Sequence, residues 1–352
     1  MRGSRPGRLL LAASLILAVL TGCAGTGRMP PEAGATSPAP HAGVFTWIME
    51  NDVFTGSDDN YTSGLALSWA TDEVGRHGED SFVRGWADFW SFLPFIGDPG
   101  HRNWASWTVG HEIHTPKDLS AGNPDENDQP YAGILFVDSS LYARRGRWGH
   151  FFNLRTGVVG PLSGAEQMQQ LWHETVNTVQ PEGWDYQLPN EPVVNLDYGV
   201  AQVLLAGGDE DEFSWRVVPL GGASLGTYFT GLSLGAYGEV GWNLPRALGG
   251  STLRSGFQAA SGIGGGPESR FSASIFGGAG AFAVAHYLPL DGTVFRESRS
   301  VDSEPLVGSL TFGVSARYGR AAISFALSHS TETFEGQVGR PEYGTISAIW
   351  YF

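Results

Sequence analysis

The feature that most constrains this chain is a period-two alternation of apolar and small polar residues, in segments of about ten residues. In residues 310–318 the apolar side chains share one face of an extended strand, while Thr, Gly, Ser and Arg share the other. Residues 322–329 and 61–70 repeat the pattern. From Val44 onward there is no run of 18 apolar residues, so the pattern predicts an all-β protein that crosses a membrane with strands.

Twelve strands are expected, an even number as a closed bacterial barrel requires. The last of them finishes on Trp350, Tyr351 and Phe352, and aromatic side chains are typical where such strands meet the lipid headgroups. The predicted fold is an antiparallel transmembrane β-barrel over residues 44–352. The expected strands are 44–53, 61–71, 104–115, 130–144, 147–159, 194–206, 213–223, 227–241, 269–288, 306–318, 320–331 and 342–352.

Composition and charge exclude several other classes of protein. Charged residues make up only 16% of the chain and 50 of its 352 residues are glycine, which disfavours a helical bundle and a disordered chain. The formal net charge of −15 disfavours a nucleic-acid partner, because an acidic surface repels phosphates. A single cysteine excludes a disulfide framework, and the histidines show no spacing for a structural zinc site.

The N-terminus predicts export. Residues 1–22 open with three arginines and continue as a short apolar run, which is typical of a secretory signal peptide. The run ends Leu-Thr-Gly before Cys23, a sequence that resembles a lipoprotein processing box, so we expect Cys23 to be lipidated. The alternative is cleavage by the ordinary signal peptidase near Ala24. Residues 23–43 are rich in proline and small polar residues and are expected to form a flexible tether.

Two long insertions interrupt the expected strands. Residues 72–103 are rich in Trp and Phe and suggest a short interfacial helix. Residues 160–193 contain Ser163 followed three residues later by Glu166, a capping-box spacing that predicts a helix running to about Val179.

Strand parity predicts where the polar residues gather. If both ends of an even-stranded barrel are periplasmic, the first, third and fifth connections lie outside the cell. Asn51 and Asp52, then His111 to His114, and then the helix that carries His173 would therefore meet at one rim. The same rule places residues 72–103 on the periplasmic side, where connections are usually short.

Several of these residues are candidates for chemistry. A neutral imidazole at His173 could take a proton from a water that attacks an ester, whereas the alternative is a solvated histidine on a loop helix. Asp52 with Glu50 could bind a hard cation such as Ca²⁺, and the alternative is an acidic strand end that faces water. Asn51 and Asp52 can serve one site only if the strand frays or bulges there. Thr62 is expected on the small-residue face of its strand, as a lumen or site residue would be.

Two other clusters are not expected to bind metal. His111 and His114 are three residues apart in a strand and so should point to opposite faces. The acidic segment 125–128 lacks the spacing of a calcium-binding loop and is expected to be a solvated turn.

The chain resembles the outer-membrane lipid A 3'-O-deacylases over most of residues 44–352. The resemblance is carried by Glu-Asn-Asp-Val-Phe-Thr-Gly at 50–56 with Tyr-Thr-Ser-Gly at 61–64, by Gln-Pro-Tyr-Ala-Gly at 129–133, by Gly160-Pro161 with the helix of His173, and by Pro-Glu-Gly-Trp at 181–184. The second half of the chain matches only as a barrel.

The resemblance implies a twelve-stranded barrel that uses Ca²⁺ to hydrolyse the 3'-linked acyloxyacyl ester of lipid A in the outer membrane of a Gram-negative bacterium. It implies that His173 is the catalytic histidine and that Asn51, Asp52 and Thr62 belong to the site. A glutamate that the family pattern has after the histidine is replaced here by Val179. A lysine of the second outer loop has no clear match, although Lys117, the chain's only lysine, is nearby.

The expected partners are lipid A or lipopolysaccharide, outer-membrane lipids and the barrel assembly machinery. Two other functions stay open at this point: a non-catalytic outer-membrane barrel, acting as a pore or scaffold, and a different lipid esterase such as a phospholipase.

Overall fold

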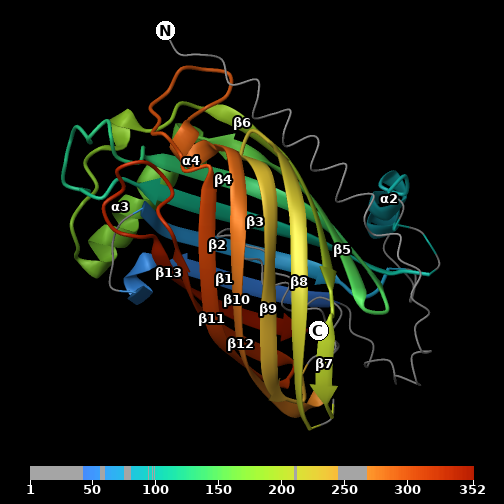
Figure 1. The fold of residues 1–352 in the computed structure, drawn as a ribbon. Helices are drawn as coiled ribbons and strands as arrows, with labels where there is room; N and C mark the ends of the chain where they lie inside the picture. Colours follow the sequence, from blue (N-terminus) through green and yellow to red (C-terminus); the bar gives the residue numbers. More distant parts are fainter. Residues whose placement is uncertain are drawn as a thin grey trace.

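The computed structural model describes residues 43–55, 60–74, 81–93, 95–96, 98, 100–209, 212–244 and 268–352. The expected signal peptide, Cys23 and all but the last residue of the expected tether lie outside these residues. Thirteen strands of the described part form one antiparallel sheet that closes into a barrel (Figure 1). They are β1 (Gly43–Asn51), β2 (Asn60–Thr71), β3 (Arg102–Thr115), β4 (Ala132–Arg145), β5 (Trp148–Val159), β6 (Glu191–Gln202), β7 (Leu205–Gly208), β8 (Phe213–Gly226), β9 (Phe229–Trp242), β10 (Glu268–Tyr287), β11 (Leu306–Gly319), β12 (Ala321–Ser330) and β13 (Glu342–Tyr351).

The barrel closes because the first strand pairs with the last. Val44 of β1 lies opposite Tyr351 of β13, and Asn195 of β6 lies opposite Gly226 of β8. The short β7 pairs with β8 beyond the end of β6, and so it continues the line of β6 after a break of two residues. The predicted twelve-strand barrel is confirmed, and the single strand expected at 194–206 is divided into β6 and β7. At the break the amide of Leu204 still donates to the carbonyl of Val217, so the pairing with β8 resumes at once.

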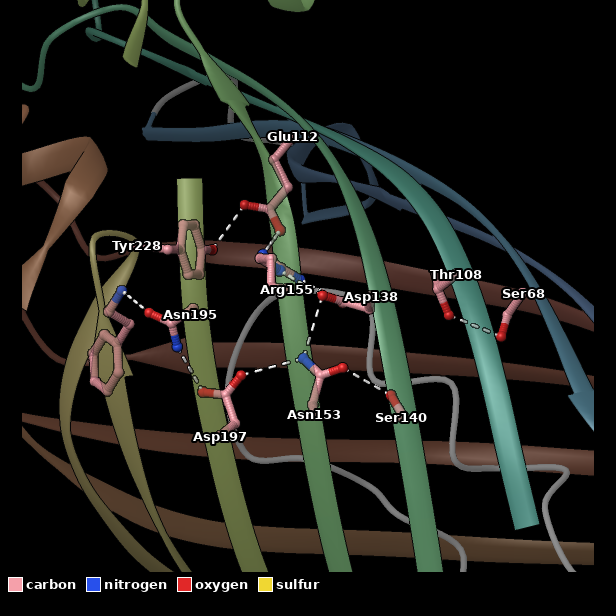
Figure 2. A network of polar contacts seen from close by, with 11 residues as sticks. Ser68, Thr108, Glu112, Asp138, Ser140, Asn153, Arg155, Asn195, Asp197 and Tyr228 are labelled. Carbon is pink, nitrogen blue, oxygen red and sulfur yellow. Dashed lines mark hydrogen bonds and ion pairs between the residues drawn. The ribbon is translucent and has the colours of Figure 1, made fainter. Parts of the chain in front are cut away.

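Part of the barrel interior is packed with side chains, and a pocket lined by His114, Phe282 and Tyr287 adjoins this part. Inward-pointing apolar side chains, among them Phe136, Phe229 and Phe282, form a buried cluster in the part nearer the β8–β9 turn. Next to it lies a polar network contributed by β3, β4, β5, β6 and the β8–β9 turn (Figure 2). At its centre the Arg155 guanidinium donates two hydrogen bonds of 2.9 Å to Asp138 and one of 2.9 Å to Glu112. These strands therefore enclose packed side chains and ion pairs in place of an aqueous channel.

Among the described helices, two lie against the outside of this wall near its two ends, and a third contributes Leu288 to the interior cluster. α2 (Ser81–Phe89) falls in the insertion expected to be helical, and α3 (Ala165–Val176) in the long outer loop, while α4 (Leu288–Asp291) is a single turn. Figure 1 shows α2 and α3 at opposite ends of the barrel. Gly43 and Phe352 exchange backbone hydrogen bonds, so the described ends of the chain meet on the side opposite α3. By the usual arrangement of bacterial barrels that side is periplasmic and α3 is extracellular.

None of the helices in the described residues has the length and apolar character to cross a membrane.

The predicted capping box is wrong, although the helix exists. α3 begins at Ala165, after Gly164 in the left-handed conformation, and no side chain caps it. Ser163 belongs instead to a 3₁₀ turn, η2 (Pro161–Ser163), and its hydroxyl donates 2.6 Å to the carbonyl of Gly160. The helix ends at Val176, three residues before the expected end, because Asn177 takes the left-handed conformation and closes it.

Candidate functional site

The candidate site is built where α3 packs on the outer face of β3 and β4. Gly133 of β4 makes this close approach possible: a Cβ there would overlap the Cβ of Ala165 and the hydroxyl of Ser163. Ala165 continues into a small buried cluster with Ile113 of β3 and with Tyr131 and Trp184 of the loops. The start of the helix is thereby fixed against the barrel wall.

The barrel-facing side of α3 is a stripe of three buried residues. Ala165, Gln169 and His173 follow one another at intervals of four, which places them on one face of the helix. The indole N–H of Trp184 donates 2.9 Å to Oε1 of Gln169, and the Trp184 ring packs at 4.8 Å from that of Tyr131. These contacts hold the middle of the helix in register with the loop that follows it.

His173 is enclosed and oriented. His173 is only 3% exposed, so the alternative of a solvated loop histidine is wrong. Nδ1 is hydrogen-bonded to the carbonyl oxygen of Val179, and because a carbonyl can only accept, Nδ1 carries the proton. Nε2 of the neutral ring then holds the lone pair that a general base needs. Val179 stands where the resemblance implies a glutamate, so here a main-chain oxygen orients the ring.

A second side of α3 is apolar and exposed. Leu171 is 65% exposed, and several of its neighbours are also uncovered: Leu162, Met168, Trp172, Val176 and Val179. A helix normally buries its apolar stripe, whereas α3 leaves this one uncovered. On the outer wall of a membrane barrel that arrangement turns the apolar stripe toward lipid and keeps His173 against the protein.

The acidic end of β1 lies at the same end of the barrel as α3 (Figure 1). β1 ends at Asn51, and Asp52 starts the 3₁₀ turn η1 (Asp52–Thr55). The strand alternation therefore stops between these two residues, as a site shared by Asn51 and Asp52 requires. The Asp52 side chain is fully buried and Asn51 is nearly so. Phe54 of η1 packs on Gly344 of β13, which places this turn over the outer wall.

Glu50 lies on the other side of the wall from Asn51. It falls on the inward face of β1, and the hydroxyl of Thr345 donates to it at 3.2 Å. Thr62 lies in β2 at a register shift between Tyr61 and Ser63, and its side chain is outside what the structure describes.

The metal prediction is supported by donor chemistry alone. Within the described residues, no three His, Cys, Asp or Glu side chains come together as a metal-binding group. Asp52 and Asn51 offer a carboxylate, an amide oxygen and main-chain oxygens, which are ligands that Ca²⁺ takes. Ca²⁺ binding therefore stays a prediction, and these two residues have the chemical groups to act as ligands.

The histidines of β3 do point to opposite faces. His111 is on the outer face, beside the main chain of Ser163, whereas His114 lies in the interior with Nε2 3.6 Å from Glu112. The acidic segment 125–128 forms a turn in which the Asn127 amide donates 2.9 Å to Asp125. Both observations agree with the sequence expectations.

Sequence reasoning missed the interior network of Figure 2. Asn153 donates 3.2 Å to Asp138 and 3.2 Å to Asp197, and the Tyr228 hydroxyl donates 2.7 Å to Glu112. The signal was present, because single charged residues recur on the small-residue face of neighbouring strands. It could be used only once the register showed that Asp138 lies directly opposite Arg155.

Comparisons with known proteins identify the family from the sequence and the fold from one solved structure. The family model described as outer membrane protein LpxR matches residues 9–352. The structure of LpxR from Salmonella typhimurium is similar, with a TM-score of 0.70 and 18% identity, covering 88% of this chain and 100% of that one. The β domain of the Bordetella autotransporter BrkA covers 88% of this chain and 99% of its own, at 9% identity and a TM-score of 0.41. No curated protein sequence matches the chain. The chain is therefore a member of the LpxR family of outer-membrane proteins.

Proposed function

We propose that the protein hydrolyses an acyl ester of lipid A in the outer leaflet, at the 3'-linked acyloxyacyl group. One observation carries this proposal: the His173 ring is buried, its Nδ1 is hydrogen-bonded to the carbonyl oxygen of Val179, and Nε2 is left as the base. The exposed apolar side of α3 supports a location of this histidine at lipid level. Lipid A is the lipid that fills the leaflet at that end of an outer-membrane barrel.

In the proposed reaction Nε2 of His173 takes a proton from water, and the resulting hydroxide attacks the ester carbonyl carbon. The bond between that carbon and the sugar oxygen then breaks, so the acyl group leaves as a carboxylic acid, and the protonated His173 returns its proton to the sugar oxygen. Asn51 and Thr62 orient the ester or the water. Ca²⁺ would be held by Asp52 with Asn51 and main-chain oxygens, and when bound it would stabilise negative charge on the carbonyl oxygen. Glu50, from the inner side of the wall, would add negative charge nearby.

Two other functions are less well supported. An open pore conflicts with the packed interior around Arg155 and Phe136. A phospholipase would use the same histidine chemistry, and what favours lipid A is the location of the site on the extracellular side together with membership of the LpxR family.

The test is a chain-release assay. The purified mature protein is incubated with lipid A in mixed micelles, with and without a calcium chelator, and the products are identified by mass spectrometry. Loss of one acyloxyacyl group from lipid A supports the proposal. Release of fatty acid from added phospholipid alone would show that the protein is a phospholipase.

His173→Asn is the informative variant, since its amide N–H can still donate to Val179 while the base is lost. We expect the rate to fall about 10²- to 10⁴-fold with the barrel intact. His329→Asn, at a half-exposed histidine paired with Glu342, is the matched control and should keep its activity. Asp52→Ala should lose activity that high Ca²⁺ partly restores if Asp52 holds the metal. Wild-type turnover in His173→Asn would refute the proposed mechanism.

A further inference from the structure

The periplasmic end carries a second apolar surface, formed by α2 and the residues after it. Val83 and Trp90 pack onto the outer wall of the barrel against Ala105, Leu141 and Phe152, with the rings of Trp90 and Phe152 4.6 Å apart. Phe89 and Phe92 pack on the ring of Trp90, with ring centroids 5.0 and 5.6 Å from it, and are still 64% and 70% exposed. Two large exposed aromatic side chains beside a lipid-facing wall are typical of a membrane-interface contact.

An arginine-rich turn lies beside these aromatics. The β4–β5 connection reads Arg144-Arg145-Gly146-Arg147, in a chain that has only 21 Lys and Arg residues and a net charge of −15. Arg145 and Arg147 are exposed, and Arg145 approaches Asp98 of the α2 segment at 3.9 Å. The ring of Phe95 stacks on His150 of β5 at 4.9 Å, so the helix segment and the turn form one continuous surface.

We infer that Phe89, Phe92, Arg145 and Arg147, here called the α2 surface, bind the headgroup region of a glycerophospholipid in the periplasmic leaflet. The aromatic rings supply contact with the upper acyl chains and the guanidinium groups supply paired donors to the phosphate. The position argues for this occupant, because phospholipids fill the leaflet at the end of the barrel opposite α3. The inference is independent of the proposed ester hydrolysis, which takes place at the other end.

The test measures lipid retention by the full mature protein. The protein in detergent is mixed with phosphatidylglycerol or with a galactosyl diacylglycerol of the same acyl chains, and bound lipid is counted by native mass spectrometry. We expect phosphatidylglycerol to bind at least tenfold more tightly than the glycolipid. Arg145→Ala with Arg147→Ala should weaken phosphatidylglycerol about fivefold for each arginine, and leave the glycolipid unchanged. Phe89→Ser with Phe92→Ser should weaken both lipids.

The control is the pair Phe295→Ser and Arg296→Ala, an equally exposed Phe and Arg in the loop after α4 at the opposite end. It should retain lipid as the wild type does, and all variants should show the heat-dependent gel shift of a folded barrel. Equal retention by the wild type and the arginine variant, equal binding of the two lipids, or equal loss in the control would each overturn the inference. A change of oligomeric state with unchanged lipid retention would assign the surface to a contact between copies, and also overturns it.

Discussion

Gly133→Ala is the sharpest test of the idea that α3 must sit tightly on the barrel wall. The added Cβ would overlap the Cβ of Ala165 and the hydroxyl of Ser163, and the Cα of Ala165 is only 3.4 Å away. The β4 backbone is held by pairing on both sides, and the Gly133 carbonyl also accepts 2.9 Å from the Gly160 amide. The barrel is therefore the stiffer partner, and the helix must move.

Overpacking of this kind costs about 1–3 kcal/mol, which falls on the docking of α3. A displacement of about 1 Å at a reacting group can lower a rate by about 10²-fold. We therefore expect Gly133→Ala to lose ester hydrolysis by about that factor and to keep the barrel's heat-dependent gel shift. Limited proteolysis should cut residues 160–190 faster than in the wild type, a readout that does not depend on the substrate.

Gly238→Ala is the matched control, because a Cβ at that strand glycine meets only the Arg216 carbonyl at 3.8 Å. It should behave as the wild type in all three measurements. If Gly133→Ala is cut no faster and turns over normally, the helix tolerates displacement and close docking is not what positions His173.

Three further outcomes follow from the interior and the outer loops. Arg155→Met leaves the carboxylates of Glu112 and Asp138 buried without their counter-charge, so unfolding should be easier by about 3–5 kcal/mol, seen as a lower temperature for the heat-dependent gel shift. Burial raises the pKa of Tyr131 to about 12, above the unfolded value of about 10. The loop packing that buries this ring therefore has its full stability below pH 10 and weakens as the pH rises toward 12. Proteolysis of the outer loops should accelerate between about pH 10 and 12 in the wild type, and less so in Tyr131→Phe. In planar bilayers the wild type should show no steady conductance, and a stable open channel would contradict the packed interior.

The strands could be predicted because successive residues of a membrane-barrel strand face the lipid and the interior in turn, so apolar and small polar side chains alternate. The strand expected at 306–318 therefore matches β11 within one residue. The break between β6 and β7 could not be found, since residues 203–204 carry no proline or glycine and the interruption depends on which neighbours pair at that height.

Local signals were less reliable in the loops. Ser163 and Glu166 have the spacing of a capping box, but Ser163 is drawn into the turn that lets α3 approach Gly133, so tertiary packing overrides the local preference. The place of His173 near the edge of an apolar stripe gave no sign that it is buried. Its burial depends on how α3 docks, which leaves Leu171 and Trp172 uncovered.

The uncovered apolar side of α3 determines how the protein would encounter its substrate. A site whose open side faces lipid samples molecules that diffuse within the leaflet, so the quantity that governs encounter is the surface mole fraction of the substrate and not its bulk concentration. Diluting the membrane with inert lipid would slow the reaction, whereas diluting the suspension with buffer would leave each membrane's rate unchanged. For such a protein, the composition of the surrounding leaflet is itself the reactant concentration.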